Sequence, residues 1–320
     1  MKIGVFDPVF GKMELEPMLD KIRDLGLGAV EIGAGNYPGD RHCRPAELLA
    51  DSSARKAFAE AFASRGLEIS ALSCHGNPIH PNPKQAQHDD AVFRDTVRLA
   101  SELGVGVVNL FSGCPGDSPE ARQPNWVTCA WPPEYAEIVE WQWSEIVLPY
   151  WREAGAFAAS NGIRLGFEMH PGFVVYNPKT LLRLRAEVGD MIGANLDPSH
   201  LFWQGIDPIV AIRELAGAIN HVHAKDTAID PVNTARNGVL DLERYDDVAN
   251  RSWVFRSVGD GHDVLFWKRF VSALRVTGYD HVLSIEHEDS LASTDEGLAR
   301  AIGTLKQAVL SEPATAMWWA

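Results

Sequence analysis

The sequence predicts a (β/α)8 barrel, an α/β fold in which eight parallel strands alternate with eight helices. Short apolar runs of strand length alternate with longer segments of helical periodicity along almost the whole chain, and eight of each can be counted. The apolar runs are nearly continuous, which is typical of parallel strands covered by helices. No GxGxxG motif opens the first helix, as an open doubly wound sheet would favour. We therefore expect residues 1–320 to form one barrel domain.

The first half of the chain contains four strand–helix units. Strands are expected at residues 2–7, 29–35, 67–76 and 105–113, and helices at residues 13–26, 46–66, 88–104 and 144–162. Gly26, Gly66 and Gly104 stand at the ends of the first three helices, because glycine accepts the left-handed conformation that commonly terminates a helix.

The second half continues the alternation. Strands are expected at residues 163–170, 192–200, 219–226 and 281–289, and helices at residues 177–189, 207–218, 265–278 and 293–310. Two gaps between successive strands are about twice as long as a normal repeat, and neither contains an obvious further strand. They predict insertions at about residues 112–143, after the fourth strand, and 227–257, after the seventh. Both follow a strand, on the face where barrel active sites form.

The first insertion is rich in tryptophan, with Trp126, Trp131, Trp141 and Trp143 in a short span. Two interpretations of these side chains are open. They either stack on a bound substrate, for which Trp126 and Trp131 are the candidates, or they pack the insertion onto the barrel or onto a partner subunit.

Charge and cysteine content exclude some classes of function. Acidic residues outnumber basic ones by 43 to 29, which gives a formal net charge of −14. This balance argues against nucleic acid and against an anionic membrane surface, because both require a basic face on the protein. The chain has four cysteines without a CxxC pair and no apolar run long enough for a membrane span. We expect a cytoplasmic protein with reduced thiols.

Polar side chains close every predicted strand from the third onward. They are His75, Asn109, Glu168 with His170, Asp197 with His200, His221 and His223 with Lys225, and Glu286 with Glu288. One histidine at a barrel end is most often a hydrogen-bonded structural residue. Core strands do not normally carry several ionisable groups unless these are paired or bind a metal. The set therefore predicts a metal site at the carboxyl ends of the strands.

Four of these residues make the candidate ligand set: Glu168, Asp197, His223 and Glu286. Three carboxylates and one imidazole suit one divalent cation such as Mn²⁺, Mg²⁺ or Co²⁺, with open positions for water or substrate oxygens. A closed structural zinc site would prefer cysteine and histidine ligands, and no cysteine lies in register.

The motifs ExH, NLDPSH, HVHAKD and SIEHED, in this order on the last four strands, resemble the xylose isomerase-like TIM-barrel superfamily of sugar isomerases and epimerases. The resemblance covers nearly the whole chain. It implies that the four candidate ligands bind one divalent cation, for which manganese is the expected ion. It also implies that the cation holds adjacent oxygens of a keto sugar while a proton moves at the neighbouring carbon.

Such chemistry needs a base close to the α-carbon and a group that stabilises the developing oxyanion. His170 lies two residues beyond Glu168 on the same strand face and is the candidate base. Lys225 lies two residues beyond His223 and is the candidate for the oxyanion, although Lys225 or a ligand carboxylate also remains open as the base. The further substrate-binding candidates are His75, Asn109, His200, Asp226 and His262, where Asp226 has a structural role as its alternative.

Three functions are compatible with this set. The tryptophan-rich insertion and the HGNPIHPNP segment resemble the large subunits of bacterial C-glycoside deglycosidases. That resemblance implies cleavage of 3-oxo-C-glucosides together with a smaller β-rich subunit, and an oligomeric enzyme. The alternative is a ketose isomerase or a keto-sugar 3-epimerase. The remote alternative is an apurinic-site endonuclease with three zinc ions, but Asn109 stands where that family has a histidine, and the net charge of −14 disfavours DNA.

Overall fold

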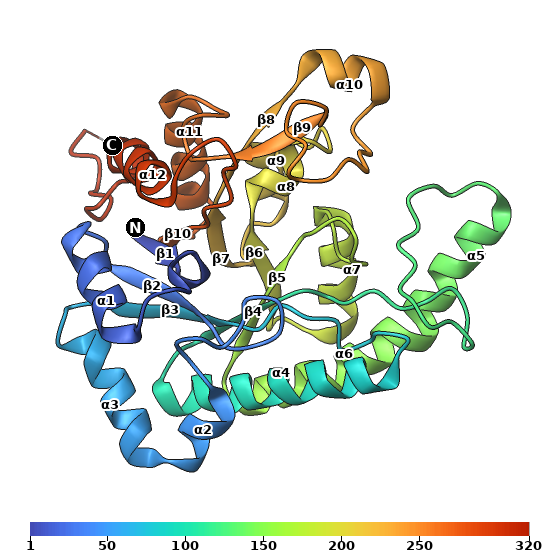
Figure 1. The fold of residues 1–320 in the computed structure, drawn as a ribbon, viewed down its shortest axis with the longest axis horizontal. Helices are drawn as coiled ribbons and strands as arrows, with labels where there is room; N and C mark the ends of the chain where they lie inside the picture. Colours follow the sequence, from blue (N-terminus) through green and yellow to red (C-terminus); the bar gives the residue numbers. More distant parts are fainter. Residues whose placement is uncertain (320) are drawn as a thin grey trace.

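A computed structural model describes residues 1–319 and shows a closed barrel of parallel strands surrounded by helices (Figure 1). Neighbouring strands follow the order β1-β10-β7-β6-β5-β4-β3-β2 around the barrel. The barrel strands are β1 (Lys2–Phe6), β2 (Ala29–Gly33), β3 (Glu68–Ser73), β4 (Val107–Leu110), β5 (Arg164–Glu168), β6 (Ile192–Leu196), β7 (Ile219–Ala224) and β10 (Val282–Ile285). The predicted (β/α)8 fold class is confirmed.

The outer layer consists of helices that pack apolar faces against the strands. The longer helices are α1 (Leu15–Asp24), α3 (Ser52–Ala63), α4 (Pro83–Leu103), α6 (Leu148–Ser160), α7 (Pro178–Val188), α11 (Val264–Val276) and α12 (Thr294–Ala308). Shorter ones are η1 (Asp7–Phe10), α2 (Pro45–Ala50), α5 (Pro133–Trp141), η2 (Gln142–Val147), α8 (Pro198–Phe202), α9 (Pro208–Glu214) and α10 (Pro231–Asn237). In the described part of the chain, none of the helices combines the length and the apolar character needed to cross a membrane.

The helix predicted at residues 46–66 is in fact two helices, α2 and α3, separated at Asp51. Asp51 has an extended backbone, and its carboxylate accepts hydrogen bonds from the backbone N–H groups of Ser53 and Ala54. Aspartate is among the preferred residues at a helix N-terminus, and here this local preference interrupts an otherwise helical pattern.

The segment after β7 contains a strand pair that the sequence analysis missed. β8 (Asp226–Ile229) and β9 (Trp253–Arg256) form a two-stranded antiparallel sheet with α10 between them in sequence. Both strands are only four residues long and lie far apart in the chain, so neither has a recognisable periodicity.

The tryptophan-rich segment after β4 ends in α5, which projects away from the barrel (Figure 1). No residue of α5 is buried, and Trp131, just before it, is 73% exposed. Trp143, by contrast, is buried in the main core. The tryptophans of this segment therefore have different environments.

Candidate active site

The four candidate ligands converge at the carboxyl end of the barrel. Glu168 ends β5, Asp197 follows β6, His223 lies in β7, and Glu286 follows β10. These strands are consecutive neighbours in the barrel, so their ends meet at one place. Each residue offers a ligand atom, and these atoms all lie within 4.8 Å of one another.

The local charges fit a divalent metal. Asp197 Oδ2 and His223 Nδ1 are buried and have no hydrogen-bond partner among residues 1–319. His223 Nδ1 lies 3.1 Å from Glu286 Oε2 and 3.5 Å from Glu168 Oε2. Carboxylates crowded together in a buried site repel one another unless a cation lies between them. Three carboxylates and one nitrogen form a donor set for a divalent cation.

Lys225 carries a positive charge at the edge of this cluster. Its Nζ donates to Glu286 Oε2 at 2.8 Å and to Glu288 Oε2 at 2.9 Å, and lies 3.3 Å from Asp197 Oδ2. Burial favours the neutral amine, but Glu286, Glu288 and Asp197 together raise the pKa of Lys225 well above its usual value. The side chain is therefore an ammonium and a hydrogen-bond donor.

His170, unlike Lys225, is uncharged. Its Nδ1 donates to the carbonyl of Pro171 at 2.6 Å, which leaves the lone pair on Nε2. Burial and the neighbouring His200 lower the pKa of His170 to about 3. At neutral pH the imidazole is therefore uncharged and in the form that can accept a proton.

A cavity of about 320 Å³ opens above the cluster. Five of the predicted site residues line it: His75, Glu168, His170, Lys225 and Glu286. One wall is aromatic, with Tyr37 and Phe111 at a ring distance of 6.0 Å, and Phe173 is stacked on Phe111 at 4.2 Å. The cavity thus combines a charged floor with an apolar wall, as is usual for binding sites of small molecules.

Comparison with known proteins identifies the family. Residues 19–308 match the family model described as the xylose isomerase-like TIM barrel. The chain belongs to this family.

Among its relatives is the uncharacterized protein YfiH of Bacillus subtilis (strain 168), 39% identical over 97% of this chain and 99% of that protein. Another is the inosose dehydratase of Geobacillus thermodenitrificans (strain NG80-2), 26% identical over 51% of this chain and 54% of that protein. Among solved structures, the IOLI protein with a binding zinc atom has a TM-score of 0.63 at 18% identity. That alignment covers 96% of this chain and 98% of the other.

Two further candidates in this xylose isomerase-like barrel lie against Glu168. His75 Nε2 is 3.0 Å from Glu168 Oε2, and His200 Nε2 is 3.0 Å from Glu168 Oε1. Burial opposes ionisation of Glu168, but the contacts with His200 and His75 lower the pKa of this carboxyl well below its usual value. His200 lies on α8 rather than on the predicted strand, because β6 ends at Leu196. His200 contacts the carboxylates of Glu168 and Asp197 and does not line the cavity.

The structure does not bring Asp226 and His262 to the cavity. The Asp226 carboxylate accepts hydrogen bonds from the backbone N–H groups of Gly259, Gly261 and His262, and it lies 2.7 Å from His262 Nδ1. The His262 ring in turn stacks on Phe202 at 3.7 Å. This pair holds the loop before α11. The arrangement corresponds to the structural role that the sequence analysis gave as the alternative for Asp226.

Three other substrate-binding candidates also lie outside the cavity. Trp126 packs edge-on against Tyr176 at a ring distance of 5.5 Å, and Trp131 faces solvent. Asn109 is fully buried below the cavity floor, where its side-chain amide donates to Glu31 at 2.8 Å. Any contact of these three residues with a substrate would require a rearrangement of the site.

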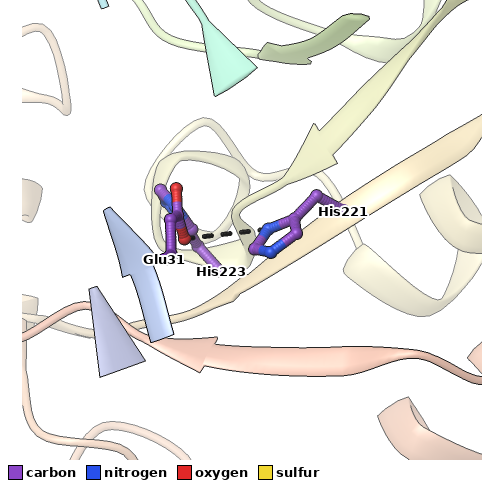
Figure 2. Close-up of side chains that lie close together, drawn as sticks. All are labelled: Glu31, His221 and His223. Atoms are coloured by element: carbon purple, nitrogen blue, oxygen red, sulfur yellow. Dashed lines mark hydrogen bonds and ion pairs between the residues drawn. The ribbon is translucent and has the colours of Figure 1, made fainter. Parts of the chain in front are cut away.

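The sequence analysis missed Glu31, a fully buried residue of β2. Figure 2 shows Glu31, His221 and His223 close together, on the inner side of the barrel. Burial favours the neutral acid, but His223 and His221 lower the pKa of Glu31 far below its usual range, so it is a carboxylate. The signal was present in the sequence, because one glutamate interrupts the otherwise apolar run AVEIG.

Proposed function

We propose that the chain is a divalent-cation-dependent enzyme that removes the proton next to the carbonyl of a keto sugar. The observation that carries the proposal is the convergence of Glu168, Asp197, His223 and Glu286 beside a cavity that an ammonium and a neutral histidine line. The relative named as an inosose dehydratase and the zinc-containing structure of the same fold support a cation and a keto-polyol substrate.

The proposed role of each residue in the site follows from its charge. A bound cation would polarise the carbonyl and so acidify the α-proton. His170 lines the cavity and carries a lone pair on Nε2, and this nitrogen accepts that proton. The Lys225 ammonium donates hydrogen bonds and balances the negative charge that develops on the oxygen. The aromatic wall packs against the apolar face of the substrate.

Elimination is the next step that we propose, with 3-oxo-C-glucosides of aromatic aglycones as substrates. Removal of the C2 proton places an electron pair next to C1, and the C1–aglycone bond breaks as the C1–C2 double bond forms. The aglycone leaves with the bonding pair and takes up one proton, so no oxidant or reductant is needed. Tyr37 and Phe111 at the cavity offer a surface on which a flat aglycone can stack. A smaller β-rich subunit would accompany the chain in this function.

Epimerisation or isomerisation of a free ketose is the second candidate. It is favoured by the series of contacts from Glu286 through Lys225 to Glu288, whose side chain is 49% exposed. These contacts link the buried site to solvent, so that a proton can be returned to the enediolate carbon. Reprotonation on the opposite face, or at the adjacent carbon, would give the epimer or the isomer.

The test uses purified chain with Mn²⁺ in D₂O, incubated with a 3-oxo-C-glucoside and, separately, with free ketoses. Release of aglycone assigns elimination, and a new ketose labelled at the α-carbon assigns epimerisation or isomerisation. Glu286→Gln should abolish either reaction while the circular dichroism spectrum is retained. If aglycone release does not occur even when a small β-rich subunit is supplied, elimination is excluded.

Metal content provides a separate test of the site. The four ligands predict about one divalent ion per chain, and Mn²⁺ should be the preferred ion for an oxygen-rich set. Elemental analysis of the purified chain measures this ratio. Three zinc ions per chain would contradict it and would favour the endonuclease alternative.

A further inference from the structure

Glu31 is a buried carboxylate with no access to the cavity, yet it contacts one of the proposed metal ligands. Its Oε1 and Oε2 lie 2.9 and 3.0 Å from His223 Nε2. The opposite nitrogen of the same ring, Nδ1, faces Glu168 and Glu286. His223 therefore stands between a carboxylate outside the ligand set and the proposed cation site.

The contacts of Glu31 decide which nitrogen of His223 carries hydrogen. A bare lone pair on Nε2 would point at two oxygens of a buried carboxylate, which is repulsive, whereas an N–H group there forms a charge-assisted hydrogen bond. Asn195 Nδ2 also lies 3.1 Å from Nε2, but a neutral amide competes poorly with a carboxylate for the same nitrogen. Hydrogen on Nε2 leaves the Nδ1 lone pair free to bind a metal.

Several neighbours fix the position of Glu31 itself. Ser73 Oγ donates to its Oε1 at 2.5 Å, and Asn109 Nδ2 donates to the same oxygen at 2.8 Å. On β5, a Cβ atom at Gly166 would lie 2.2 Å from Asn109 Oδ1, so glycine leaves the space that Asn109 occupies. His221 Nδ1 lies 3.8 Å from Oε2 on the remaining side. Residues of β3, β4 and β7 thus hold the Glu31 carboxylate in place.

We propose that Glu31 is a positioning residue, which holds His223 with hydrogen on Nε2 and thereby presents Nδ1 to the cation. This inference rests on the cation site of the proposed function. It extends that site to β2, which is separated from β7 by β10 and β1 around the closed barrel. Outer carboxylates that accept from a metal-binding histidine orient the ring and increase its basicity.

The first test compares Mn²⁺ binding of the native chain and Glu31→Gln by isothermal titration calorimetry, without substrate. Because glutamine has the same shape and no charge, we expect the dissociation constant to rise about 10- to 100-fold. Asp7→Asn is the matched control, since Asp7 is another buried carboxylate that contacts a histidine, His42, at 2.6 Å and touches none of the four ligands. Its Mn²⁺ affinity should stay unchanged. Equal affinity of Glu31→Gln and the native chain would overturn the proposal.

The second test measures the protonation of His223 directly, and its measurement on the native chain does not depend on whether the variant folds. Nitrogen-15 NMR of the histidine-labelled native chain reports which ring nitrogen of His223 carries hydrogen. We expect hydrogen on Nε2 both before and after Zn²⁺ is added, and a loss of this preference in Glu31→Gln. A ring without hydrogen on Nε2, or zinc bound through Nε2, would overturn the proposal. If the native chain binds no divalent ion, the proposed function fails, while the tautomer still decides the role of Glu31.

Discussion

His170 is held in a state that suits proton abstraction. The Pro171 carbonyl fixes hydrogen on Nδ1, and burial together with His200 keeps the pKa of His170 at about 3. Such a weak base can remove only a proton that is already strongly acidified. This requirement is met when the carbonyl next to that proton is polarised, so the proposed base and the proposed metal ligands would form one functional unit.

His170→Ala should therefore separate catalysis from cation binding. We expect exchange of the substrate α-proton with D₂O to fall by about 10²- to 10⁴-fold, the usual contribution of a general base. The Mn²⁺ affinity should be retained, because the four ligands are unchanged. Proton NMR measures the exchange, and calorimetry measures the affinity.

His262→Ala is the matched control for that experiment. His262 does not line the cavity, so its removal should leave α-proton exchange at the native rate. Normal exchange in His170→Ala would transfer the role of base to Glu168 or Glu286, the carboxylates that line the same cavity.

At the scale of single elements, the positions of the barrel strands were predicted better than their ends. The alternation of apolar runs located every barrel strand, because each run is flanked by polar or glycine-rich turns. The ends were less accurate. The strand predicted at residues 192–200 ends at Leu196, where Asp197 caps α8 and Pro198 takes its first position. An aspartate followed by a proline is a helix start, and it overrode the apolar pattern here.

Helix α6 anchors the segment after β4 through Trp151. The indole is fully buried, donates from Nε1 to the Ser112 carbonyl at 2.9 Å, and packs edge-on against Phe167 of β5 at 4.7 Å. It thus ties a helix to the loop after β4 and to the next barrel strand. Trp131 makes no comparable contact and is 73% exposed.

Trp151→Ala should lower the free energy of unfolding by about 3–5 kcal/mol, the usual effect of removing a buried aromatic side chain. Trp131→Ala should change it by less than about 0.5 kcal/mol, as for most exposed positions. Urea unfolding followed by circular dichroism measures both values. An effect of Trp131→Ala as large as that of Trp151→Ala would show that the exposed indole is buried in solution, for example by a second chain.

For the whole molecule, closure of the barrel determines what the sequence could and could not predict. Glu168, Asp197 and Glu286 were predictable because each follows an apolar strand directly, so position along the chain located them at one end of the barrel. The pairing of Glu31 with His223 was not predictable, because β2 and β7 are not neighbours and their side chains meet only across the closed interior. This contact depends on the curvature of the whole sheet, which no local pattern encodes.

At the opposite end of the barrel, Glu68 links three strands. It accepts hydrogen bonds from Lys2 at the start of β1 and from His281 just before β10, the latter at 2.6 Å. The hydrogen bonds from His281 and Lys2 lower the pKa of Glu68 from 4.5 to about 2, against the effect of partial burial. These contacts lie where the first and last barrel strands pair, near the N-terminus that Asp280 holds at 2.8 Å.

Glu68→Gln should therefore reduce stability in a pH-dependent manner. Because the folded pKa lies below the unfolded value of 4.5, the carboxylate stabilises the fold fully above that pH and loses this effect as the pH falls toward about 2. Since Glu68 is partly exposed, solvent screening limits the expected loss to about 1 kcal/mol at neutral pH. Urea unfolding of native chain and variant at pH 7 and pH 3 should show a smaller difference at pH 3. Glu137→Gln, on the exposed helix α5, should show no difference at either pH. A difference between native chain and Glu68→Gln that is equal at both pH values would mean that Glu68 acts through packing and not through its charge.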